Sequence, residues 1–129
     1  MEDLSNKTFV VTGANSGIGF AAAKQFAARG AEVVLVCRDE TKGLAAVKDI
    51  EESTGNTNIV LEVADFSSLA SVRELADRLL LGYESIDVLC NNAGGANANR
   101  QLTDEGFELT LVTNHLSGYL LTRLLLPLP

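Results

Sequence analysis

The chain has 129 residues, of which 47% are hydrophobic and 21% charged, a composition typical of one globular domain. The formal net charge is −7, so a phosphate backbone would be repelled and nucleic acid is a poor candidate partner. The sequence shows neither an apolar run long enough to span a membrane nor the pattern of a secretory signal. We expect one cytoplasmic domain over residues 1–129.

Four short apolar runs predict buried strands at residues 8–12, 33–37, 59–63 and 86–90. Between them, apolar residues recur at helical spacing. The expected inner faces of these three helices are, in chain order, Ile18, Ala22 and Phe26; Leu44, Val47 and Ile50; and Leu69, Val72, Ala76 and Leu79. Strands that alternate with helices of this length predict a parallel sheet with right-handed crossovers.

The ends of these helices are marked by residues with known capping preferences. The expected caps are Asp39 and either Ser67 or Ser68 at the starts, and Gly30, Gly55 and Gly82 at the ends. After the fourth strand, the small and polar residues 91–102 are expected to form a loop. A last helix is expected from Thr103 to Leu126, where Pro127 ends it.

The segment Thr12-Gly13-Ala14-Asn15-Ser16-Gly17-Ile18-Gly19 directly follows a predicted strand and directly precedes a predicted helix. Gly13 allows a tight exit from the strand, Gly17 lets a pyrophosphate approach the backbone, and Gly19 allows close packing of the helix. The N–H groups and the positive dipole end of the helix would then face the phosphates. The alternative is an ordinary strand–helix turn. The pattern predicts a dinucleotide-binding turn made by Gly13, Asn15, Ser16, Gly17, Ile18 and Gly19.

This octapeptide resembles the phosphate turn T-G-x-x-x-G-x-G of the short-chain dehydrogenase/reductase family. Residues 91–94 read N-N-A-G, like the family motif that supports the sheet and lines the nicotinamide side. By this resemblance Asn91, Ala93 and Gly94 contact the cofactor. The implied fold is an α/β Rossmann-type doubly wound parallel sheet that stops after the fourth strand and the following helix.

Two further positions match the same family. Asp65, just after the third strand, corresponds to the acid that contacts the adenine, and Asn114 falls where the family carries its catalytic asparagine. The amino-acid sequences of residues 36–39 and 114–116 most resemble those of the retinol-dehydrogenase-like branch of the family. The resemblance implies hydride transfer between nicotinamide and a small-molecule carbonyl or alcohol.

The end of the second strand usually decides between NADP and NAD. Arg38 follows the strand at once, and its planar guanidinium suits a 2′-phosphate. The competing residue is Asp39, which lies 20 residues after Gly19, where the acid of an NAD site is expected. We interpret Asp39 as a helix cap, and therefore expect NADP rather than NAD.

The family's proton-transfer pair, Y-x-x-x-K, does not occur in this sequence. Tyr83 lies in a predicted turn. Tyr119 has Arg123 four residues on, but it follows Asn114 too closely to be the family's tyrosine, so we expect a packing role for Tyr119 and a solvated Arg123. We therefore expect the N-terminal half of an oxidoreductase, inactive alone. The alternative is a non-catalytic dinucleotide-binding or interaction module that acts through a partner.

Two further expectations concern the thiols and the surface. Cys37 and Cys90 each end an apolar run, which favours buried, reduced thiols, and a single histidine, His115, leaves no cluster for a metal site. An uncovered fourth strand would favour a homo-oligomer or pairing with a full-length chain. The leucines expected to lack part of their packing partners are Leu120, Leu121, Leu124, Leu125, Leu126 and Leu128.

Overall fold

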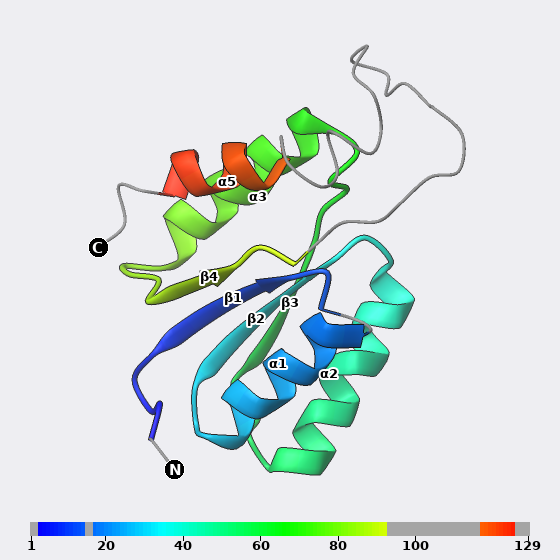
Figure 1. Cartoon of the computed structure of the whole chain (residues 1–129), viewed down its shortest axis with the longest axis vertical. Coiled ribbons are helices and arrows are strands. Elements are labelled where there is room, and N and C mark those ends of the chain that lie inside the picture. Colours follow the sequence, from blue (N-terminus) through cyan, green and yellow to red (C-terminus); the bar gives the residue numbers. More distant parts are fainter. Residues whose placement is uncertain (1–2, 15–16, 93–116, 126–129) are drawn as a thin grey trace. The chain divides into compact units, whose positions relative to one another are not determined.

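A computed structural model describes residues 3–14, 17–92 and 117–125 (Figure 1). It divides into two compact units. The first lies within Met1–Val63 and Ser85–Asn92 and holds the sheet, and the second lies within Ala64–Glu84 and Ala93–Pro129 and, in its described residues, holds two helices. Within the described ranges, no helix combines the length and the apolar character needed to cross a lipid bilayer.

The sheet has four parallel strands, which are β1 (Thr8–Thr12), β2 (Glu32–Cys37), β3 (Ile59–Val63) and β4 (Val88–Cys90). Their spatial order is β3-β2-β1-β4. The chain thus steps outward from β1 to β3 and then returns to the other side of β1, the reversal that defines a doubly wound sheet. The predicted strands are confirmed, although β4 is shorter than expected.

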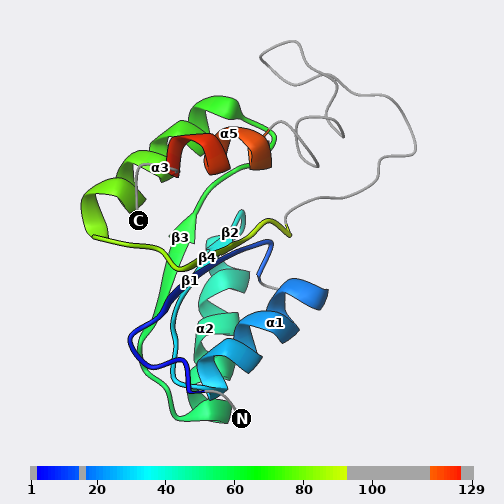
Figure 2. The ribbon, with the colours of Figure 1, turned by 60° about the vertical axis from the view of Figure 1, so that its left-hand side comes forward.

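Two helices, α1 (Gly17–Ala28) and α2 (Glu40–Thr54), cover one face of this sheet (Figures 1 and 2). The core between them contains alternate strand residues, among them Phe9, Val11, Val33 and Leu35. The intervening residues Val10, Val34 and Val36 are also fully buried, which explains why the strands read as continuous apolar runs.

The predicted inner face of α1 is wrong by one residue, whereas in α2 the prediction is confirmed at Ile50 and wrong at Leu44. The buried residues of the two helices are Gly19, Ala23 and Ala27 in α1, and Gly43, Ala46 and Ile50 in α2. Ile18 is 81% exposed and Leu44 is 55% exposed, while Phe26 is only partly buried against the core. Small residues face the sheet because they let the helix backbones approach it closely.

The predicted caps in the sheet unit are confirmed. Asp39 has extended backbone angles, and its carboxylate accepts a hydrogen bond of 3.0 Å from the backbone N–H of Lys42. Gly55 ends α2 in the left-handed region at φ 74°. Gly30 follows α1 at φ 94°, and its N–H donates to the carbonyl of Ala27.

The second unit contains α3 (Leu69–Gly82) and α5 (Ser117–Leu125), which lie side by side (Figures 1 and 2). Ser68, not Ser67, caps α3, and the buried residues of α3 are Val72, Leu75, Ala76 and Leu79. Of the last predicted helix only Ser117–Leu125 is described. Leu121 and Leu125 are buried, so the expectation that they lack packing partners is wrong.

Candidate functional site

The candidate site lies where the carboxyl ends of β1 and β4 adjoin. In open parallel sheets, ligands bind outside the carboxyl ends of the strands at the point where the strand order reverses. Here that point is between β1 and β4, since Val11 pairs with Cys90 in parallel register. The glycine turn leaves β1 at this place, and the asparagine pair at 91–92 leaves β4 there.

Thr12, the last residue of β1, joins the two strand ends. Its side chain is fully buried, donates a hydrogen bond of 3.2 Å to the carbonyl of Cys90, and accepts one of 2.8 Å from the backbone N–H of Asn92. From the sequence alone, Thr12 is predicted only as the first residue of the glycine motif. Its position at the end of a buried strand, with a polar side chain, was the available sign of this role.

The glycine turn is tied to the sheet on both sides. Gly13 adopts φ 62°, a left-handed conformation that favours glycine, and its N–H donates to the carbonyl of Val36 on β2 at 2.9 Å. On the other side the Asn92 side-chain amide donates to the carbonyl of Gly13 at 3.3 Å. The turn is therefore held between the ends of β2 and β4.

A glycine is needed at position 19 for a more specific contact than the predicted packing of the helix on the sheet. A Cβ at Gly19 would overlap with the carbonyl oxygen of Gly13 and with the side-chain nitrogen of Asn92. The first turn of α1 thus sits directly against the turn that precedes it. Any larger side chain at position 19 would force these segments apart.

Gly17 begins α1 with φ 62°, and among the described residues no atom beyond its chain neighbours and its own helix backbone lies within 4 Å of where its Cβ would be. The first turn of a helix leaves backbone N–H groups without intrahelical partners. Open space, free N–H groups and the positive end of the helix dipole together fit an anionic group such as a pyrophosphate. Ile18, exposed beside Gly17, is available to a ligand rather than to the core.

Arg38 and Asp39 follow β2 directly, and both are exposed. One carboxylate oxygen of Asp39 is occupied in capping α2. Arg38 lies two residues after Val36, whose carbonyl accepts the hydrogen bond from the Gly13 N–H. Arg38 and the glycine turn thus both follow the carboxyl ends of strands, at the same edge of the sheet.

Asp65 belongs to the helical unit. Its carboxylate accepts hydrogen bonds from the backbone N–H of Ser67 at 2.9 Å and from the Ser67 hydroxyl at 2.6 Å. The Asp65 backbone N–H in turn donates to the hydroxyl of Ser71 at 2.9 Å. These contacts order the segment before α3 and use one carboxylate oxygen, Oδ1.

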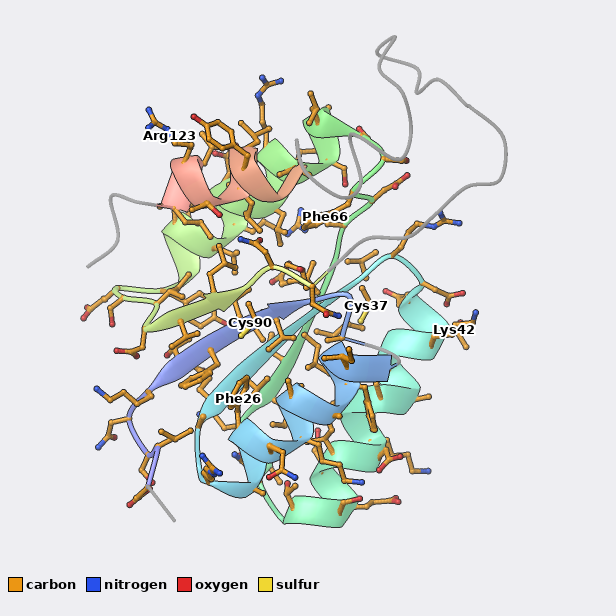
Figure 3. All side chains as sticks on the ribbon, viewed as in Figure 1. Phe26, Cys37, Lys42, Phe66, Cys90 and Arg123 are labelled. Carbon is orange, nitrogen blue, oxygen red and sulfur yellow. The ribbon has the colours of Figure 1, made fainter. Side chains whose placement is uncertain are left out.

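Neither cysteine forms a disulfide, as expected (Figure 3). Cys37 is only 2% exposed, and burial raises the pKa of its thiol, against the smaller opposite effect of a hydrogen bond from the Ala14 backbone. Cys90 is half-buried, and burial raises its pKa as well. Both thiols are therefore neutral at physiological pH.

Several predicted site residues lie outside the described part of the chain, which are Asn15, Ser16, Ala93, Gly94 and Asn114. Asn91 is exposed at the end of β4. On α5, Tyr119 is 57% exposed, so the packing role expected for it is wrong, while Arg123 is exposed as expected. Within the described ranges, no group of histidine, cysteine and acidic residues could hold a metal ion.

The strand order and the glycine turn place the chain in the class of dinucleotide-binding α/β folds. The model of the short chain dehydrogenase family matches residues 7–128, so the chain belongs to that family.

Among its relatives, human dehydrogenase/reductase SDR family member 13 is 46% identical over 127 residues, covering 98% of this chain and 33% of the relative. Human retinol dehydrogenase 13 is 43% identical over 123 residues, covering 95% of this chain and 37% of the relative. The chain thus spans about a third of the length of these curated relatives.

Solved structures agree with the fold. The crystal structure of an uncharacterised protein from Mycobacterium paratuberculosis is similar at a TM-score of 0.85 and 40% identity, covering 99% of this chain and 44% of that one. L-sorbose reductase from Gluconobacter frateurii, complexed with NADPH and L-sorbose, is similar at a TM-score of 0.82 and 28% identity. That match covers 97% of this chain and 48% of the reductase.

Proposed function

We propose that this chain is the nucleotide-binding part of an NADP(H)-dependent oxidoreductase that acts on a carbonyl or alcohol. The observation that carries the proposal is the junction at the reversal of the strand order. There Thr12, Gly13, Gly19 and Asn92 lock the glycine turn between two strand ends, with the start of α1 open beside it.

The residues proposed to hold the cofactor come from both units of the chain. Gly13, Gly17 and the first turn of α1 would bind the pyrophosphate, and Ile18 would contact the bound nucleotide. Asn91 and the segment after β4 would lie on the nicotinamide side, and Asp65 would meet the adenine. The bound nicotinamide would supply or accept the hydride.

The choice of NADP(H) over NAD(H) is supported by the residues after β2. Asp39 is engaged as the N-cap of α2, so its Oδ1 is taken by the Lys42 backbone rather than left for a ribose hydroxyl. Arg38 is exposed and ready to meet a 2′-phosphate. The similarity to a reductase complexed with NADPH points the same way.

Hydride transfer in this family also needs a group that moves a proton. We propose Asn114 as a residue that orients the reacting groups, but these 129 residues contain no tyrosine followed four positions later by lysine. We therefore expect cofactor binding without turnover when the chain is assayed by itself with aldehydes and ketones.

Thermal unfolding of the purified chain, alone and with excess NADPH or NADH, tests the proposal. A nucleotide at 100 times its dissociation constant adds about 2.7 kcal/mol of stability. For a domain of this size that raises Tm by several degrees. We expect the larger shift with NADPH. A cooperative transition that neither nucleotide moves would refute the assignment of a nucleotide site, and an equal shift from both would refute the preference for NADP(H).

A further inference from the structure

We propose that Ser67 is a positioning residue, whose hydroxyl fixes the Asp65 carboxylate in an orientation that selects a purine with a 6-amino group. The inference rests on the proposed function, because it explains how the chain distinguishes the adenine of its nucleotide from other purines. It starts from the hydrogen bonds of the short turn that precedes α3.

The backbone of Asp65 is held in place by its neighbours in the sequence. Asp65 begins a four-residue turn, which is closed by the Ser68 N–H donating to the Asp65 carbonyl at 3.1 Å. The Asp65 N–H donates to the hydroxyl of Ser71, in the first turn of α3, at 2.9 Å. The flanking residues Ala64 and Phe66 are both buried. The turn and the two buried neighbours therefore fix the point from which the Asp65 side chain extends.

Ser67 binds one oxygen of the carboxylate twice. Oδ1 of Asp65 accepts from the Ser67 backbone N–H at 2.9 Å and from the Ser67 hydroxyl at 2.6 Å. The second bond restricts rotation about the Cβ–Cγ bond, which is otherwise broadly distributed in aspartate. Within the described ranges, Oδ2 accepts no hydrogen bond, and Asp65 is half-buried. Ser67 thus leaves Oδ2 with open lone pairs in a fixed direction.

A fixed carboxylate oxygen distinguishes purines by the group at C6. An ionised carboxylate only accepts hydrogen bonds, and the 6-amino group of adenine donates them. Hypoxanthine and guanine carry a carbonyl oxygen at C6, which would face Oδ2 as a second acceptor and leave both oxygens without a donor. A carboxylate that could rotate would turn away from this carbonyl. The selectivity therefore depends on the orientation that Ser67 imposes and not on the charge alone.

The test compares the binding of NADPH with that of its hypoxanthine analogue, in which a carbonyl replaces the 6-amino group. Dissociation constants are measured by calorimetry for the wild type, Ser67→Ala, Ser67→Thr and Ser68→Ala, and the Tm of each protein is recorded. Ser68→Ala is the matched control. The Ser68 hydroxyl caps α3 by accepting from the Ser71 N–H at 3.2 Å, and it forms no hydrogen bond with the Asp65 carboxylate.

We expect the wild type to bind NADPH about tenfold more tightly than the analogue. Ser67→Ala should lower this ratio by about threefold, and Ser67→Thr should restore it, because threonine keeps the hydroxyl. Ser68→Ala should lower Tm through the lost cap and leave the ratio unchanged. If Ser67→Ala does not fold, Ser67→Cys replaces it, because a thiol fills similar space and is a weak donor.

The outcomes separate this inference from the proposed function. If the wild type binds neither nucleotide, the proposed function fails and the role of Ser67 fails with it. If the wild type binds both equally tightly, the nucleotide site stands and the selectivity assigned to Asp65 and Ser67 is overturned. If the wild type prefers NADPH and Ser67→Ala keeps the full ratio, only the role of Ser67 is overturned. An equal loss of the ratio in Ser68→Ala also overturns it, because the effect would then come from the stability of α3.

Discussion

Thr12, at the end of β1, is a fully buried polar residue whose hydroxyl forms two hydrogen bonds with the backbone at the end of β4. Thr12→Val keeps the shape of the side chain but removes both hydrogen bonds. The carbonyl of Cys90 and the N–H of Asn92 would each lose this partner. We expect the free energy of unfolding to fall by about 1–3 kcal/mol. Urea unfolding followed by circular dichroism measures this change.

Thr12→Ser is the matched control, because it keeps the hydroxyl and removes only a methyl group. We expect it to retain the ability to bind NADPH, whereas Thr12→Val should weaken binding, since Asn92 also holds the carbonyl of Gly13. Equal unfolding midpoints for Thr12→Val and the wild type would show that these hydrogen bonds contribute little.

At the scale of the elements, the sequence predicts where helices lie better than which face they bury. Strand ends and caps follow from local chemistry, as Asp39 and Gly55 show. The periodicity of large apolar residues selected Ile18 and Leu44, yet both are exposed. The true inner faces begin with glycines, and how closely a helix lies on a sheet is a property of tertiary packing.

Gly43 shows that this close packing leaves no room for a side chain on the inner face of α2. Alanine at a helix interior is better than glycine by about 1 kcal/mol, but the added methyl would overlap with Leu61. We expect Gly43→Ala to lower the free energy of unfolding by about 1 kcal/mol, because overpacking outweighs the gain in helix propensity. Chemical denaturation of the purified variant measures the difference.

A second background checks the cause of this effect. In a Leu61→Ala protein the methyl at position 43 has room, so only the gain in helix propensity remains. There, Gly43→Ala should raise the free energy of unfolding instead. The same sign in both backgrounds would mean that Leu61 is not the residue that Gly43 accommodates.

At the scale of the whole molecule, the parallel sheet and the glycine turn were predictable because each depends on a short stretch of sequence. The contacts that join them were not. Thr12 lies 80 positions from Asn92, and Gly13 lies 23 from Val36. Such pairs meet only once the strand order is set, which a single sequence does not reveal.

The strand order predicts a gradient of stability across the sheet. In the part of the chain that the structure describes, β1 and β2 are paired on both sides, whereas β3 and β4 are paired on one side and are less buried. Hydrogen exchange should therefore be slowest at Val10, Val11, Val34 and Leu35, and faster in β3 and β4. Added NADPH should slow exchange at the glycine turn and just after β2 and β4, where the proposed site lies. Equal protection in all four strands would contradict the gradient, and a nucleotide effect confined to β3 would contradict the site.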